Sequence, residues 1–189
     1  MASVSKAPLV WIDCEMTGLD TDNDTIMSLA AFITDADLNI LDEEGYEAII
    51  HHSEEELDRM GEWCTRHHGQ SGLTQSCIDS STTAEEAAEG LLQYIKKYVP
   101  ERRTALLAGN SVHADKSFLV KAPYKPITDH LHYRILDVSS IKEAARRWAP
   151  KDVLKRIPRK QMLHEARADI LESIEEARFY REAFFLKPN

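Results

Sequence analysis

Runs of apolar residues divide the first third of the chain into three expected strands. Segments 7–15, 25–37 and 45–52 are apolar or alternate between apolar and polar positions, and turn-like residues separate the second from the third. Short apolar runs bounded by turn residues are typical of β-strands. We therefore expect an antiparallel meander of three strands.

The hydrophobic period then changes to that of helices. Segment 80–100 carries apolar residues on one helical face, Thr82 and Glu85 are spaced as a capping box, and Pro100 marks the end. Strands and helices alternate after it, so we expect one α/β domain over 1–189, with a mixed sheet of five strands whose later members run parallel, flanked by helices. The later strands are expected at 104–109 and 134–140, and the later helices at 115–122, 140–149 and 165–184.

Composition narrows the class of protein. Apolar types make up 43% and charged types 29% of the 189 residues, which excludes a disordered or repeat-driven chain. No apolar run approaches the ~20 residues that span a bilayer, and the first residues lack a signal-peptide pattern, so we expect an intracellular protein. Three widely spaced cysteines form no CxxC pair, which argues against a disulfide framework.

Charge is unevenly distributed. The net charge is −9, and residues 1–60 hold 2 basic against 15 acidic side chains. Segment 142–160 carries eight basic and two acidic residues, which indicates either a phosphate-facing strip or a solvated helix and loop. Proteins that bind long nucleic acids normally carry an excess of Lys and Arg, so any nucleic-acid substrate is expected to be short.

Two acids stand at the end of the first expected strand. Asp13 and Glu15 follow four apolar residues, and side chains two positions apart on a strand point to the same face. Close carboxylates repel each other, and a divalent cation between them would relieve that repulsion. The spacing indicates either a site for a hard divalent ion or, if the strand has already ended, two acids in a solvated turn.

Three further residues gain meaning only in combination. Asp115 stands near the start of an expected helix, where an acid also suits the helix dipole. Asp169 lies in the last expected helix, five residues after His164. Five helical positions turn through about 500°, so these two side chains converge only if His164 precedes the helix. An imidazole there could take the proton from a metal-bound water.

In chain order, these four acids and the histidine resemble the DEDD superfamily of exonucleases, in the variant whose third motif is H-x4-D. Several longer segments resemble the oligoribonuclease family in particular. They are WIDCEMTGL (11–19), GNSVHADKSFL (109–119), HYRILDVSS (132–140) and HEARADILESI (164–174). Two positions depart from the family pattern: Ser28 stands in a second strand that often reads I-x-E-I-A, and Ala168 in a motif that often reads H-x-A-L-D-D.

The resemblance implies a fold, an activity and a cofactor. The fold is ribonuclease-H-like, and the enzyme is a homodimer that removes nucleotides from the 3′ end of short oligoribonucleotides, especially dinucleotides, to give 5′-mononucleotides. It acts in the cytoplasm or the mitochondrion. His164 is the general base, and two divalent cations, Mg²⁺ or Mn²⁺, act on the attacking and leaving oxygens. The implied metal ligands are Asp13, Glu15, Asp115 and Asp169.

The resemblance also implies how a short RNA is held. Leu19 would wedge between the bases, while Trp63 and the partner subunit's Tyr133 would stack on them, which predicts weak sequence preference. The residues implied at the terminal 5′ phosphate are His68, Ser111, Ser139 and Arg134 of the partner subunit. Taken alone, Trp63 could be a core anchor, and Tyr133 with Arg134 ordinary dimer contacts.

Other readings of the same residues remain. Cys64, His67, His68 and Cys77 could form a zinc cluster, although their spacing fits no familiar ligand pattern. A related 3′ exonuclease acting on DNA or on longer RNA ends is the rival enzyme. A catalytically silent module that captures dinucleotides is the rival from another class.

Overall fold

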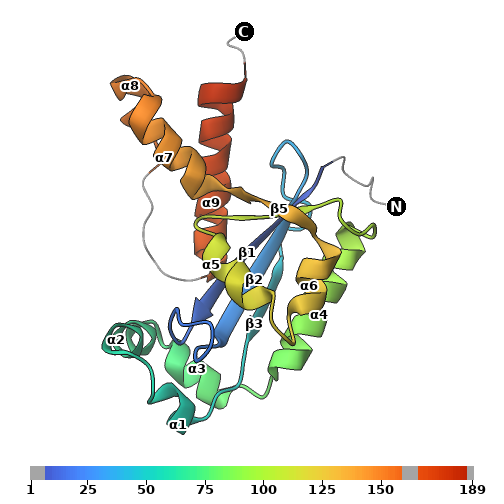
Figure 1. Cartoon of the computed structure of the whole chain (residues 1–189), viewed down its shortest axis with the longest axis vertical. Helices are drawn as coiled ribbons and strands as arrows, with labels where there is room; N and C mark the ends of the chain where they lie inside the picture. Colours follow the sequence, from blue (N-terminus) through green and yellow to red (C-terminus); the bar gives the residue numbers. More distant parts are fainter. Residues whose placement is uncertain (1–6, 159–165, 187–189) are drawn as a thin grey trace.

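A five-stranded mixed sheet forms the centre of the computed structural model, which describes residues 7–158 and 166–186 (Figure 1). Its order is β3-β2-β1-β4-β5. β1 pairs antiparallel with β2, and β2 with β3, whereas β4 and β5 continue the sheet in parallel. The expected sheet is confirmed. Its strands are β1 (Leu9–Met16), β2 (Ile26–Thr34), β3 (Tyr46–Ile49), β4 (Leu106–Gly109) and β5 (His132–Asp137).

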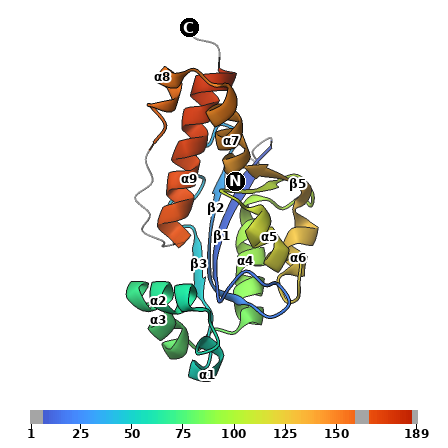
Figure 2. The same ribbon diagram turned by 60° about the vertical axis from the view of Figure 1, so that its left-hand side comes forward.

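Helices cover both faces of the sheet (Figure 2). Alternation along β1 assigns its side chains to two cores, because successive residues of a strand point to opposite faces. Val10 and Ile12 pack toward α4, α5 and α6, whereas Leu9 and Trp11 pack toward α7 and α9. These helices are α4 (Ala84–Tyr98), α5 (His113–Leu119), α6 (Lys125–His130), α7 (Val138–Trp148) and α9 (Ala166–Tyr180).

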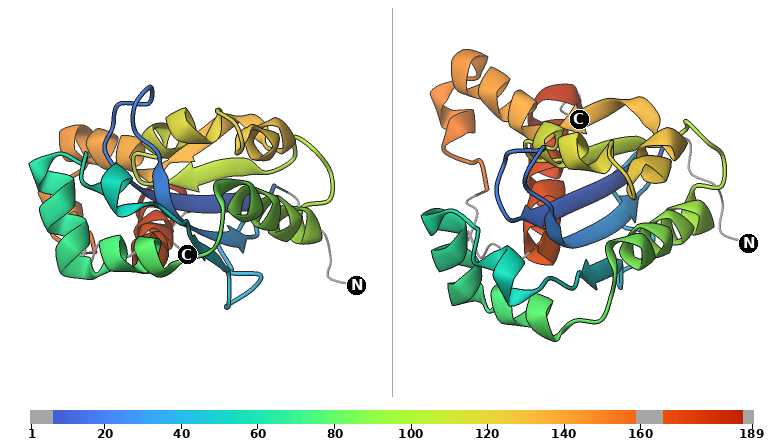
Figure 3. Two further views of the ribbon diagram at one scale, coloured as in Figure 1. Left: turned by 90° about the horizontal axis from the view of Figure 1, so that it is seen from below. Right: turned by 60° about the horizontal axis from the view of Figure 1, so that its bottom comes forward.

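Three short helices, for which the sequence pattern predicted no element, gather at the end of the sheet where β1 finishes (Figures 1 and 3). α2 is mostly polar and shows no apolar stripe, and α1 is a single turn, so neither has a clear periodic signal. They enclose a small core around Met27, Met60 and Cys77. They are α1 (Glu54–Leu57), α2 (Glu62–Ser71) and α3 (Leu73–Asp79).

The capping box of α4 lies one residue later than the sequence suggested. Thr83 is the N-cap: its hydroxyl accepts from the Glu86 amide at 3.1 Å, and its own amide donates to the Glu86 carboxylate at 2.8 Å. Thr82 is engaged elsewhere, because its carbonyl accepts from the His51 amide at 2.8 Å. That contact keeps Thr82 outside the helix.

The helices in the last third of the chain differ from those expected, because α6 and a short helix in the basic segment were not expected and the last helix changes its form near its end. The basic segment forms the end of α7 and the short α8 (Lys151–Leu154), and α9 continues into a π-helical turn, η1 (Arg181–Phe185). On α7, Glu143 pairs with Arg146 and Arg147, which neutralises part of the basic strip. None of the described helices is long and apolar enough to cross a membrane.

Candidate functional site

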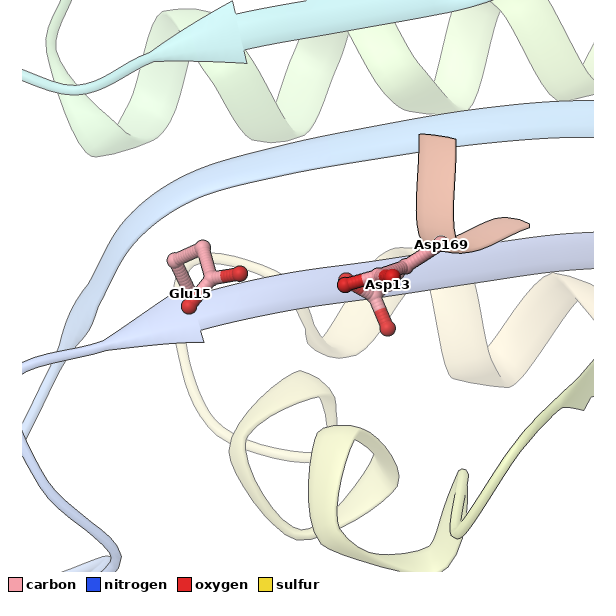
Figure 4. Close-up of side chains that lie close together, drawn as sticks. All are labelled: Asp13, Glu15 and Asp169. Atoms are coloured by element: carbon pink, nitrogen blue, oxygen red, sulfur yellow. The ribbon is translucent and has the colours of Figure 1, made fainter. Parts of the chain in front are cut away.

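Three carboxylates from two distant parts of the chain meet beside the end of β1. One oxygen from each of Asp13, Glu15 and Asp169, together called the acid triad, lies within 4.8 Å of the others. Figure 4 shows Asp13 and Glu15 on β1 and Asp169 reaching them from α9. β1 continues to Met16, so the alternative of two acids in a solvated turn is wrong.

Asp115 reaches the same strand from α5. It lies in the first turn of α5, is only 6% exposed, and its Oδ1 accepts from the Cys14 amide at 2.9 Å. Cys14 points away from the triad, toward the core that contains α5. Asp115 therefore lies close to the end of β1 and adds negative charge to the triad.

Burial and mutual repulsion shift the protonation of these acids. Burial raises the pKa of Glu15 to about 7, with the negative charges of Asp169 and Asp115 adding to the effect. Burial likewise raises the pKa of Asp115 to about 7, against the lowering effect of its hydrogen bond from Cys14. A compact set of carboxylate oxygens that repel one another fits a hard divalent cation, because the cation neutralises the charge that burial penalises.

These shifts predict how pH and metal change stability. The folded protein binds protons at Glu15 and Asp115 more tightly than the unfolded chain does, where their pKa values are 4.5 and 3.8. Protonation therefore stabilises the metal-free fold below pH ~4, and this stability is lost as the pH rises to about 7. Mn²⁺ at 100 times its Kd should add about 2.7 kcal/mol at pH 8, or a rise in Tm of ~5 to 10 °C, and much less at pH 5.

Thermal unfolding at both pH values, with Mn²⁺ or with chelator, measures this dependence. The variant E15Q should lose most of the Mn²⁺ effect, and E101Q, which changes an exposed acid outside the site, should keep it. Equal Mn²⁺ shifts at pH 5 and pH 8 would show that the ion does not bind to these carboxylates.

The loop after β1 presents Leu19 to solvent. Thr17 Oγ1 donates to Asp24 Oδ1 at 2.9 Å, and the Asp20 amide donates to Asp24 Oδ2 at 2.9 Å, so Asp24 holds both arms of the loop. A Cβ at Gly18 would lie 2.3 Å from the Asp24 carboxylate, which explains glycine there. Leu19 is 76% exposed at the tip of this loop.

α2 places an exposed tryptophan near the end of β1. His68 is buried, and its Nε2 donates to the Met16 carbonyl at 2.9 Å, which ties α2 to the strand. Trp63 is 56% exposed and stacks on His67, with ring centroids 4.5 Å apart. The Trp63 ring is therefore a surface platform rather than a core anchor.

A zinc cluster does not form among these neighbours. The Cys77 thiol donates to the Met27 carbonyl within the small core of α1–α3, and His68 is committed to Met16. In the described part of the chain, no group of cysteine and histidine side chains is compact enough to hold a metal ion.

Two of the residues expected at a phosphate do meet. The hydroxyls of Ser111 and Ser139 lie 3.1 Å apart. Asp137 organises them, because its Oδ1 accepts from both backbone amides at 2.9 Å. Ser111 adopts a φ of 54°, and the bond from its amide helps to hold this left-handed conformation. The sequence reasoning missed Asp137, although an aspartate two residues before a serine at a helix start is a typical N-cap signal.

Arg134, another residue expected at the phosphate, and its aromatic neighbour Tyr133 lie on an edge strand. Tyr133 is 71% exposed, and the Arg134 guanidinium lies 5.2 Å from the centre of its ring. Both belong to β5, which β4 separates from β1. They therefore lie on a different strand from Asp13 and Glu15, at the open edge of the sheet.

A second group of side chains, which was not predicted from the sequence, fastens α9 to the sheet. Asn110 Nδ2 donates to Ser173 Oγ at 2.8 Å and to the buried Glu176 at 3.2 Å. Ser173 Oγ in turn donates to the Asp169 carbonyl at 2.7 Å, and Lys142 pairs with Glu176 at 2.8 Å. The signal in the sequence was a glutamate and a serine on the apolar face of the last helix.

The remaining expected residues are placed as follows. His164 lies outside the described residues. Ser28 lies opposite Glu15 in the register of β1 and β2, and both line a cavity of about 250 Å³ beside the triad. Ser28 thus stands next to Glu15, at the position where the family pattern often has a glutamate.

The family model described as "Exonuclease" matches residues 10–177. The probable oligoribonuclease of Schizosaccharomyces pombe is 51% identical over 93% of this chain and 68% of its own length. This chain belongs to the oligoribonuclease family. The membership confirms the expectation of a nuclease, a hydrolase of phosphodiester bonds.

Further matches agree with this oligoribonuclease assignment. The mitochondrial oligoribonuclease of Saccharomyces cerevisiae is 46% identical over 96% of this chain and 68% of its own length. Among solved structures, E. coli exonuclease I in complex with a 5cy-dT13 oligonucleotide matches with a TM-score of 0.71 and 15% identity. The match covers 95% of this chain but 42% of the exonuclease I chain, and at this identity it shows a shared fold alone.

Proposed function

We propose that this member of the oligoribonuclease family removes nucleotides from the 3′ end of short single-stranded RNA, dinucleotides above all, and releases 5′-mononucleotides. The observation that carries the proposal is the acid triad, assembled from β1 and α9 with Asp115 close by. The four acids hold two divalent cations, Mg²⁺ or Mn²⁺. When bound, such ions activate water and stabilise the departing oxygen.

The chain's own residues bind and orient the RNA. Leu19 and Trp63 are exposed near the end of β1, where an apolar wedge and an aromatic face contact bases of any identity. Ser111 and Ser139 offer paired hydroxyls to a terminal 5′ phosphate. His68 would join them through its Nδ1, because its Nε2 donates to the Met16 carbonyl. His164 takes the proton from the attacking water.

We propose that a second copy of the chain contributes residues to the same active site. Tyr133 and Arg134 are exposed on β5, the edge strand of the sheet, and β4 separates them from the strand that carries Asp13 and Glu15. In a homodimer they would complete the partner's site, with the ring stacked on a base and the guanidinium on the phosphate. The similarity to a mitochondrial relative supports action in the mitochondrion, and the cytoplasm is the other expected compartment.

The charge distribution supports a short substrate. Fifteen of the 32 acidic residues lie within the first 60 positions, which also supply two members of the triad. A long polyanion needs many basic side chains along its path, and only two lie in these first 60 positions, whereas a dinucleotide offers its bases and one or two phosphates to local contacts.

A time course on 5′-labelled RNAs of two, four and seven nucleotides tests the proposal. We expect metal-dependent stepwise loss from the 3′ end, fastest for the dinucleotide, and none with chelator. DNA of the same lengths serves as the matched control. Faster cleavage of DNA or of the longest RNA would favour the rival exonuclease, and dinucleotide binding without cleavage would favour the silent module.

A further inference from the structure

The first turn of α9 is fastened to the connection between β2 and β3 by one side chain. The Arg167 guanidinium donates to two successive main-chain carbonyls, that of Glu43 at 2.8 Å and that of Glu44. Its Cζ also lies 4.8 Å from the centre of the Phe32 ring on β2. A planar fork of donors that meets two acceptors and an aromatic face has little freedom to move.

This contact stands at a particular point of the helix. Arg167 precedes Asp169 by two residues. Ser173, Glu176 and Arg178, whose Nη2 donates to the Leu38 carbonyl at 2.5 Å, fasten α9 after Asp169. Arg167 fastens it on the other side, so Asp169 lies between two anchored parts of the helix.

The first turn also needs an anchor. The leading amides of a helix have no partner within the helix, so its first turn is its weakest. Here that turn carries Asp169 toward Asp13 and Glu15, and carboxylates within 4.8 Å of one another repel. Without an opposing contact, repulsion would move the start of α9 away from β1 while no cation is bound.

We propose that Arg167 is a positioning residue that holds Asp169 against Asp13 and Glu15, so that the acid triad is assembled before a cation binds. The inference rests on the proposed metal site. A preassembled site binds more tightly than one that must be ordered on binding, because the ordering cost is not taken from the binding free energy. Arg167 acts through main-chain contacts and needs no contact with the ion or the RNA.

Mn²⁺ binding to the full chain, measured by calorimetry and by the electron paramagnetic resonance of free Mn²⁺, tests this role. R167M keeps an unbranched side chain and good helix propensity but removes the guanidinium group. Its Kd for Mn²⁺ should rise roughly tenfold, the low end of the loss seen when groups that orient metal ligands are removed. At saturating Mn²⁺ its kcat should return toward the wild-type value, because no RNA contact has changed. R167K keeps the charge without the fork and should also bind Mn²⁺ more weakly than the wild type.

R178M is the matched control, because it removes another guanidinium contact between α9 and a loop carbonyl, farther from the triad. It should bind Mn²⁺ as the wild type does. Unchanged affinity in R167M, or an equal loss in R178M, would overturn the positioning role. If R167M does not fold, wild-type affinity in R167K overturns it instead. Failure of the wild-type protein itself to bind Mn²⁺ would refute the metal site of the proposed function.

Discussion

D169N is expected to reduce the release of mononucleotides from a dinucleotide RNA by at least ~10³-fold, more than the loss of a single electrostatic donor typically costs. Asparagine keeps the shape of the side chain but removes the charge that α9 contributes to the acid triad. The remaining acids on β1 would bind a cation weakly and could not place it against the substrate. Product release by liquid chromatography and Mn²⁺ binding by calorimetry measure both effects.

The fold should survive this substitution. Asp169 faces like charges in the metal-free protein, and neutralising it relieves the repulsion that helps to raise the pKa of Glu15. The metal-free variant should therefore be at least as stable as the wild type at pH 8. E175Q, which changes an exposed acid of the same helix, is the matched control and should keep full activity. Retained turnover in D169N would remove Asp169 from the site.

The sequence could predict β1 and its acids because both signals are local. Four apolar residues followed by Asp13 and Glu15 define a strand and the shared face of the two acids without reference to any other segment. Neither Asp115 nor Asp169 carries such a signal, since each is an ordinary helical acid. Only the resemblance of the whole ordered set predicted that α9 would bring Asp169 to β1.

Contacts between distant segments were out of reach of sequence patterns. His68 lies on a polar helix without periodicity, and its bond to the Met16 carbonyl depends on how α2 folds back on β1. The register of the α4 cap was missed for a similar reason, because the bond from His51 to Thr82 decides between two equally good capping boxes. Spacing alone ranks such alternatives equally, and tertiary pairing selects one.

The residues that hold α9 in place also depend on contacts between distant segments. Asn110 lies 63 residues before Ser173 and 66 residues before Glu176, yet its hydrogen bonds to both side chains fix α9 against the end of β4. Arg167 reads as one more charge on a solvated helix until its carbonyl partners are known. The ligands of a site can thus be recognised as residue types in order, whereas the groups that hold them are specified by the fold.

H164A is expected to slow hydrolysis of the dinucleotide by ~10² to 10⁴-fold at saturating Mn²⁺, the usual contribution of a general base. His164 lies outside the described residues and stands five positions before Asp169 in the sequence. An ordinary imidazole has a pKa of about 6.5, which suits a base that takes a proton from water near neutral pH. The Kd for Mn²⁺ should stay close to the wild-type value, since the acids are unchanged.

The pH profile separates this base from the metal ligands. In the wild type, kcat at saturating Mn²⁺ should rise with pH as the imidazole loses its proton. This rising limb of the pH profile should be absent in H164A. Saturating metal is required because the pKa of Glu15 is about 7 in the metal-free protein, so subsaturating Mn²⁺ would produce a similar limb through binding. H51A, which changes an exposed histidine at the end of β3, is the matched control. A near-normal rate with an unchanged limb in H164A would assign water activation to the bound cations alone.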